Sequence, residues 1–233
     1  MKTINYLAML AVALSVTACG YTNHFLEEEI PGDDAPYQTL KDVNGTAYDS
    51  WTYINLKTGE TKTHPDTSEW IYGGDGSIRK EQPSEEISID WHIAVHRYEL
   101  KTNGASVLNT GATDILSVTE LPAGNYTSDT VLPYEDEVEK GSDETQYLLI
   151  TDMSGMMDGN IGYIHYPSVN LPLCNGITRT ATGSMPPTLY GTTEEVFALK
   201  WEDGTWATLQ ITGTYSSGGS SGYLSFNYHY YSE

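Results

Sequence analysis

The sequence contains little cysteine. Only Cys19 and Cys174 occur among its 233 residues. Two thiols cannot supply the ligands of a Cys-rich zinc site. If Cys19 carries a lipid, as its surroundings indicate below, no disulfide within the chain is available. We therefore expect Cys174 to be a small buried apolar residue and not a reactive thiol.

The sequence also contains little positive charge. It has 11 Lys and Arg against 32 Asp and Glu, which gives a formal net charge of −21. Nucleic acid needs a basic surface, so this class of partner is excluded. Part of the acid lies in "LEEEIPGDDAP" at residues 26–36, which is typical of a solvated tether. An address for export to the cell surface is the alternative interpretation of this stretch.

The first residues have the pattern of a leader. "MKTINYLAMLAVALSVTAC" places Lys2 before an apolar run and small residues before Cys19. This pattern predicts a secretory signal peptide at residues 1–18 that is too short to span a membrane. "SVTAC" resembles a bacterial lipobox, which implies cleavage before Cys19 and a lipid on its thiol. A chance cysteine after an ordinary signal peptide is the alternative. A lipid would hold the protein on a membrane without crossing it.

Strand patterns dominate from about Gln38 onward. The segments "TWATLQITG" and "GYLSFNYHYY" alternate apolar and polar residues, and turn signals such as "KTGE", "EDGT" and "SSGGSSG" separate such runs. Alternation with a period of two predicts half-buried strands, and it predicts one strand across "SIDWHIAVHRYEL" as well. After a lipidated acidic tether at residues 19–37, we expect one all-β domain of many short antiparallel strands at residues 38–233, with a C-terminal meander.

Known catalytic motifs are absent from the sequence. It contains no Gly-x-Ser-x-Gly elbow, no His-Glu-x-x-His and no phosphate-binding loop. The 32 acidic residues do not single out a pair of carboxylates for glycoside hydrolysis. We therefore predict that the protein is not an enzyme.

The methionines are concentrated in two places. After removal of the signal peptide the chain keeps Met153, Met156, Met157 and Met185, in the turn-like segments "MSGMM" and "TGSMPP". A β core that used methionine as filler would scatter it along the strands. Three interpretations stay open: the loops plug an end of the sheet, the thioethers ligate a soft metal or haem, or they line a groove for a partner.

The choice of metal depends on the thioether group. Thioether sulfur suits Cu(I) and haem iron, and does not suit Ca²⁺, Mg²⁺ or Zn²⁺. Copper motifs of this kind recruit further His or Cys ligands, and only Cys174 and His165 are available here. Haem needs two axial donors and an apolar slot, which two methionine-bearing loops closing on each other would provide.

One segment resembles a known family. "SIDWHIAVHRYELKTNGAS" is similar to the W-D-[I/M]-A-x-H-R-Y-D/E segment of HmuY-like haem-binding lipoproteins, the haemophores of anaerobic Gram-negative bacteria. His92 stands where the family usually has Asp. The lipobox-like Cys19, the all-β pattern and the ending "DGTWATLQITGTY…SFNYHYY" are similar too. The resemblance extends over nearly the whole mature chain.

The resemblance implies a mostly β fold in two sheets, with haem held non-covalently between loops at one end. The founding member uses two histidines, whereas the corresponding loops here carry methionines. The resemblance therefore implies Met157 and Met185 as the axial iron ligands, with Met156 and Met153 as alternatives. It also implies haem scavenging by an outer-membrane lipoprotein at the cell surface, and delivery to a TonB-dependent outer-membrane receptor. Release into the medium is a second location left open.

The histidines, the aromatic residues and the few cations suggest further roles. His165 is the best replacement iron ligand, whereas we expect His92 and His96 to be hydrogen-bonded structural residues. The abundant Tyr and Trp leave an alternative function open, a surface adhesin or glycan-binding lipoprotein with an aromatic-lined site. Because haem propionates and the protein are both negative, local cations must offset the repulsion. The scarce candidates are Arg79, Lys80, Arg97, Lys101 and Arg179.

Overall fold

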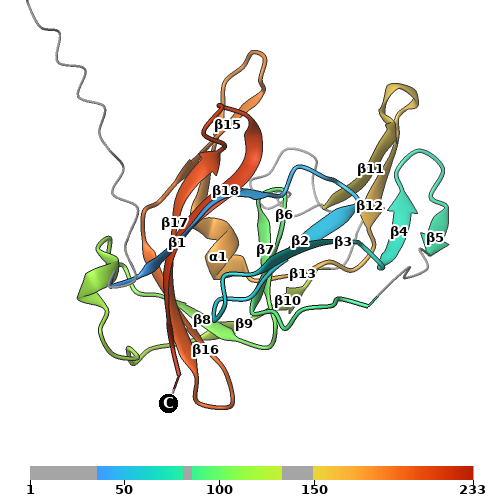
Figure 1. Cartoon of the computed structure of the whole chain (residues 1–233). Coiled ribbons are helices and arrows are strands. Elements are labelled where there is room, and N and C mark those ends of the chain that lie inside the picture. Colours follow the sequence, from blue (N-terminus) through green and yellow to red (C-terminus); the bar gives the residue numbers. More distant parts are fainter. Residues whose placement is uncertain (1–35, 81–85, 133–148, 233) are drawn as a thin grey trace, which may run out of the picture. The chain divides into compact units, whose positions relative to one another are not determined.

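The computed structural model describes residues 36–80, 86–132 and 149–232. These residues belong to one compact unit, Pro31–Glu233, in which strands dominate and the helix α1 (Leu171–Asn175) is short (Figure 1). The predicted signal peptide and the lipidation site Cys19 lie outside the described residues. Within them, no helix has the length and apolar character that a membrane crossing requires. The prediction of one all-β domain is confirmed.

The largest sheet has six antiparallel strands in the order β1-β18-β17-β16-β8-β9. The strands β16, β17 and β18 are joined by the predicted turns and form the predicted C-terminal meander. The bounds are β1 (Gln38–Asn44), β8 (Ser106–Asn109), β9 (Thr127–Ser128), β16 (Val196–Lys200), β17 (Trp206–Tyr215) and β18 (Ser221–Tyr231).

Four smaller sheets complete the described domain, where the sequence led us to expect two sheets in all. Two have four strands, in the orders β3-β2-β6-β7 and β11-β12-β4-β5, and two are the pairs β14-β15 and β10-β13. The bounds are β2 (Ser50–Ile54), β3 (Thr61–Pro65), β4 (Glu69–Tyr72), β5 (Ile78–Lys80), β6 (Ile93–His96), β7 (Glu99–Thr102), β10 (Thr130–Val131), β11 (Ile150–Gly155), β12 (Asn160–Ile164), β13 (Ser168–Val169), β14 (Ile177–Ala181) and β15 (Thr188–Thr192).

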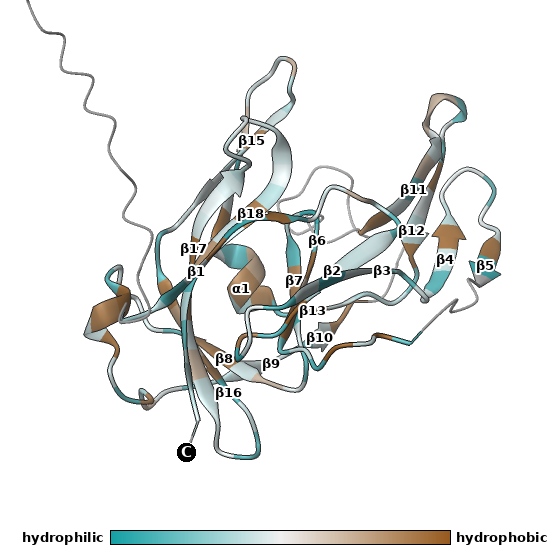
Figure 2. Cartoon of the chain, in the orientation of Figure 1, coloured by the Kyte–Doolittle hydropathy of each residue, from teal (hydrophilic) through white to brown (hydrophobic). Residues whose placement is uncertain are grey.

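The hydrophobic core lies between the six-stranded sheet, the β3-β2-β6-β7 sheet and α1. Along β18 the predicted alternation holds, because Leu224, Phe226 and Tyr228 are buried and the residues between them are half-exposed. Cys174 of α1 is buried in this core as a free thiol, as predicted. Figure 2 shows hydrophobic residues along the strands that face the core and also on β11 and β4, away from it.

Two local predictions differ from the structure. The segment expected to be one strand, residues 88–100, is a hairpin, because β6 ends at His96 and pairs with β7 across a two-residue turn at Arg97 and Tyr98. The polar face of β17 is also buried, because the segment around the 3₁₀ turn η1 (Ile115–Ser117) covers it. Gln210 on this face donates from Nε2 to the carbonyls of Thr113 (2.8 Å) and Glu194 (2.7 Å).

Candidate functional site

The first methionine segment forms the tip of the β11–β12 hairpin. A 3₁₀ turn, η3 (Met156–Asp158), joins the two strands and ends at Gly159, whose φ of 72° favours glycine. At Gly155 an added Cβ would lie 2.3 Å from the carbonyl oxygen of Asn160, so only glycine allows the strands to approach so closely. The tight tip turns Met156 and Met157 outward, with 49% and 88% of their surfaces exposed.

The second methionine segment forms the tip of the β14–β15 hairpin. Five residue pairs hold the two strands together. In the connecting loop the Thr182 hydroxyl donates to the carbonyls of Ser184 (3.0 Å) and Pro186 (2.5 Å). The Thr182 N–H donates to the Pro187 carbonyl (3.0 Å). These bonds use the polar groups of the loop and leave Met185 outside, 87% exposed.

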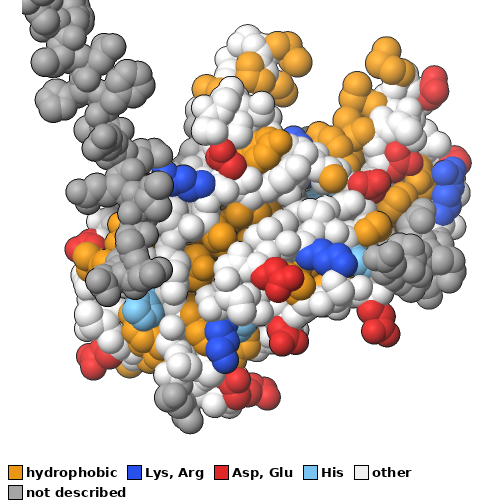
Figure 3. Space-filling view, viewed as in Figure 1, with side chains coloured by type: hydrophobic (Ala, Val, Ile, Leu, Met, Phe, Trp, Pro, Cys, Tyr) orange, Lys and Arg blue, Asp and Glu red, His pale blue; other side chains and the backbone are white. Residues whose placement is uncertain are grey.

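The two hairpins stand apart on the same side of the domain (Figure 1). Figure 3 shows them as separate projections with a hollow between them and hydrophobic side chains at both ends. Met156 and Met157 therefore lie at the tip of one projection and Met185 in the loop at the tip of the other. Met153 lies lower, half-buried in β11, in a strand and not in the turn that its sequence suggested.

A pocket of about 400 Å³ lies at the root of the β11–β12 hairpin. Its lining combines aromatic, acidic and thioether groups from Tyr48, Asp49, Trp70, Thr151, Asp152 and Met153. The Ser154 backbone N–H donates to Asp152 and, with the Tyr72 hydroxyl at 2.9 Å, holds the pKa of this carboxyl below its usual range. The pocket wall therefore carries a negative charge at neutral pH.

The root of the β14–β15 hairpin is aromatic. Tyr190 of β15 stacks on Tyr98 with the ring centroids 3.6 Å apart and the planes at 14°. The Tyr98 hydroxyl accepts from the Gly222 N–H (2.9 Å), and the Tyr190 N–H donates to the Tyr215 hydroxyl (3.3 Å). Burial raises the pKa of both Tyr98 and Tyr190, so both rings remain neutral phenols at physiological pH.

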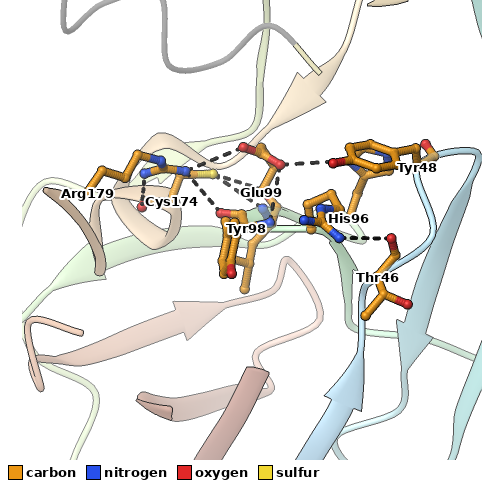
Figure 4. A network of polar contacts seen from close by, with 9 residues as sticks. Thr46, Tyr48, His96, Tyr98, Glu99, Cys174 and Arg179 are labelled. Atoms are coloured by element: carbon orange, nitrogen blue, oxygen red, sulfur yellow. Dashed lines mark hydrogen bonds and ion pairs between the residues drawn. The ribbon is translucent and has the colours of Figure 1, made fainter. Parts of the chain in front are cut away.

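The turn between β6 and β7 connects these two roots (Figure 4). On one side the His96 ring Nε2 bonds the carbonyl of Tyr48, which lines the pocket. On the other side Arg179 of β14 donates to the Tyr98 carbonyl (3.3 Å) and pairs with Glu99 (3.4 Å). Residues 96–99 therefore form a polar floor that contacts Tyr48 of the pocket wall on one side and Arg179 of the β14–β15 hairpin on the other.

The other predicted histidine roles can be compared with the structure. His92 accepts from the Leu56 N–H (3.1 Å) and contacts the rings of Trp201 and Tyr230, and burial lowers its pKa. His92 and His96 therefore have the structural roles that we predicted. His165 follows the end of β12 that is opposite to the tip, and its Nδ1 lies 3.1 Å from Glu69. It is thus placed away from the exposed methionines.

The candidate iron donors, the thioethers at the hairpin tips, are soft and neutral. The described residues hold no cluster of three His, Cys, Asp or Glu side chains that would bind a metal ion directly. Thioethers bind haem iron. The stacked rings of Tyr98 and Tyr190 and the apolar hairpin tips suit a flat apolar ring. The residues present therefore fit haem better than a hard cation.

Sequence reasoning missed the floor of the site. Tyr48, Tyr190 and the positive φ of Arg97 carry no local pattern that marks them, because arginine in a two-residue turn is not a turn signal. The sequence identified Arg97 and Arg179 as candidate cations because positive residues are scarce, but it did not predict where in the fold either residue lies.

The fold and the site together define a β protein with two projecting hairpins, a hollow between them (Figure 3) and a pocket at the root of one hairpin. The HmuY protein family matches residues 47–228, and the chain belongs to this family. The crystal structure of the apo HmuY analogue of Tannerella forsythia is 30% identical, covers 84% of this chain and 96% of its own, and has a TM-score of 0.71.

Two further crystal structures are similar. An HmuY-like haem-binding protein from Bacteroides vulgatus is 28% identical, with 84% of this chain and 93% of that chain covered and a TM-score of 0.61. Apo PinO from Porphyromonas gingivitis is 23% identical, with coverages of 84% and 98% and a TM-score of 0.66, and shares the fold. No curated protein matches the chain.

Proposed function

We propose that this protein binds haem non-covalently in the hollow between the β11–β12 and β14–β15 hairpins, with Met157 and Met185 as axial ligands. The observation that carries the proposal is the placement of these two side chains, 88% and 87% exposed, at the ends of the two facing hairpins. Met156 is the nearest alternative and Met153 the next. Membership of the HmuY family and the haem-binding relative support the choice of ligand.

Most of the affinity would come from burying the porphyrin, at roughly 25 cal/mol per Å² of apolar surface. With haem bound, Met157 and Met185 would each supply a thioether to the iron, one from each hairpin. Soft sulfur favours ferrous over ferric iron. The function is binding and transfer rather than catalysis.

The proposed function also implies a location and a partner for the protein. With a lipid on Cys19 the domain would be held at the outer membrane, and a TonB-dependent receptor would take the haem onward. Replacing Cys19 by Ala should move the protein from the membrane fraction to the soluble fraction; an unchanged distribution would contradict a lipid anchor.

The alternative of a glycan-binding lipoprotein has less support. Sugar sites use exposed aromatic faces as stacking platforms. None of the five tryptophans is exposed; Trp51 and Trp70 are buried and the others are half-buried.

The experiment is a haemin titration followed by the Soret band, with and without dithionite, at pH 7.5 and pH 5. A thioether takes up no proton in this range, whereas imidazole does so near pH 6.5. We expect a shifted Soret band, tighter binding after reduction and similar affinity at both pH values. A sharp loss of affinity between pH 7 and 5.5 would favour histidine ligands, and no shift at all would reject haem.

A further inference from the structure

Arg97 has an unusual backbone conformation at the centre of the site. Its φ is 54°, a value that residues other than glycine rarely adopt. Its backbone N–H donates to the Gly45 carbonyl (3.0 Å), which helps to hold the turn in this conformation. Such outliers gather at functional sites, because the surrounding structure must keep them in place.

The guanidinium of Arg97 lies between the roots of the two hairpins. Its Cζ is 4.6 Å from the centroid of the Tyr48 ring and 5.9 Å from that of Tyr98. Tyr48 lines the pocket beside β11, and Tyr98 stacks on Tyr190 of β15. The positive charge is therefore placed between a residue of the pocket wall and the aromatic pair at the root of the β14–β15 hairpin.

Within the part of the chain that the structure describes, no acidic side chain neutralises the charge of Arg97. Its Nη1 donates to the Thr46 carbonyl (2.9 Å), and across residues 36–80, 86–132 and 149–232 no carboxylate lies within ion-pair distance of it. By contrast, Arg179 pairs with Glu99. A guanidinium has five N–H donors, so Arg97 keeps donors for a ligand. In a chain of net charge −21, a half-buried arginine that pairs with no acidic side chain among the described residues points to an anionic ligand group.

We propose that Arg97 binds a carboxylate of the ligand, which for haem is a propionate; this inference rests on the proposed function. The planar fork of a guanidinium matches a carboxylate with two parallel hydrogen bonds. The Tyr48 ring and the Thr46 carbonyl orient it before the ligand arrives. Arg97 thereby makes the hollow selective for porphyrins with free acid groups and offsets the acidic surface of the protein.

The test compares reduced haem with its dimethyl ester by Soret titration. We expect the wild type to bind haem about tenfold or more tightly than the ester, because a hydrogen bond between charged groups is lost in the ester. Arg97→Gln should bind both porphyrins with the affinity that the wild type has for the ester, and Arg97→Lys should keep part of the preference. Arg79→Gln is the matched control, because Arg79 also lies over a tyrosine ring, 4.0 Å from Tyr72, but on the edge strand β5.

The outcomes separate the two proposals. The role of Arg97 would be overturned if Arg97→Gln kept the tenfold preference for haem over the ester. It would also be overturned if Arg79→Gln lost as much of this preference as Arg97→Gln does. Either result would leave haem binding intact. A wild type that binds neither porphyrin would overturn the proposed function and this inference with it. Melting temperatures and the ester affinity of each variant check that the site is still folded, so a loss of preference reports on the propionate alone.

Discussion

The hairpins and the scaffold beneath them use sulfur in opposite ways. Cys174 of α1 is fully buried, its Sγ accepts from the Leu100 N–H (3.3 Å), and burial raises the pKa of the thiol to about 12. Met157 and Met185 instead hold their thioethers in solvent. The scaffold therefore buries its sulfur in the core, whereas the hairpins expose theirs to solvent, where we propose that they bind the ligand. Substitutions in the two regions should therefore have separable effects.

The largest effect should come from the scaffold. Phe226 of β18 has no exposed surface, and Phe226→Ala should lower the free energy of unfolding by about 3–5 kcal/mol, because it leaves a cavity in the core. Met157→Ala and Met185→Ala should each change it by less than about 0.5 kcal/mol, because these side chains bury little surface. Urea unfolding measures both. If a methionine variant proved as unstable as Phe226→Ala, the separation of the two regions would fail.

A smaller effect should follow oxidation of the hairpins. Hydrogen peroxide transfers one oxygen atom to a thioether sulfur and leaves as water, and the sulfoxide is a harder, polar group. We expect Met157 and Met185 to be oxidised before the half-buried Met153, with Cys174 unchanged. The affinity for reduced haem should fall about tenfold, by roughly 1.4 kcal/mol. Peptide mass spectrometry and a haem titration of the same sample check this.

The control for oxidation is enzymatic reversal. Methionine sulfoxide reductases should restore the thioethers and the haem affinity together. Full affinity in a sample whose Met157 and Met185 are both sulfoxides would show that these sulfurs do not hold iron.

The smallest effect concerns a half-buried cation of the scaffold, Lys101. Lys101 Nζ lies 4.1 Å from the centroid of the Trp51 ring. Burial, opposed by the nearby Asp66 and Asp129, lowers its pKa from 10.5 to about 8. Because this folded-state pKa is below the unfolded value, the unfolded chain binds more protons between about pH 8 and 10. Stability due to Lys101 therefore rises with pH in this window.

The measurement compares the wild type with Lys101→Met at pH 7.5 and pH 9.5 by urea unfolding. From pH 7.5 to pH 9.5, the unfolding free energy of the wild type should rise by about 1 kcal/mol relative to that of Lys101→Met. Haem binding should not change, because Lys101 belongs to the scaffold. Parallel stability curves for the two proteins would show that the amine is not perturbed.

Local rules predicted the scaffold well and the site only in part. Apolar residues at every second position, such as Leu224 and Phe226, predicted the strand β18 and its buried face correctly, because successive side chains of a strand point to opposite faces. The two methionine segments could be recognised by their composition, and their use as iron ligands stays a prediction. The floor could not be derived, because Tyr98 and Tyr190 meet through the fold and Arg97 adopts a backbone conformation that its residue type does not favour.

The most direct measurement is the absorption spectrum of the ferrous haem complex of the variant in which both Met157 and Met185 are replaced by Ala, with Met153→Ala as the matched control. Two thioether ligands should give the wild type and the control a low-spin spectrum, and the double variant should lose it while its melting temperature stays unchanged. An unchanged low-spin spectrum in the double variant would contradict the claim that the two hairpin tips hold the iron.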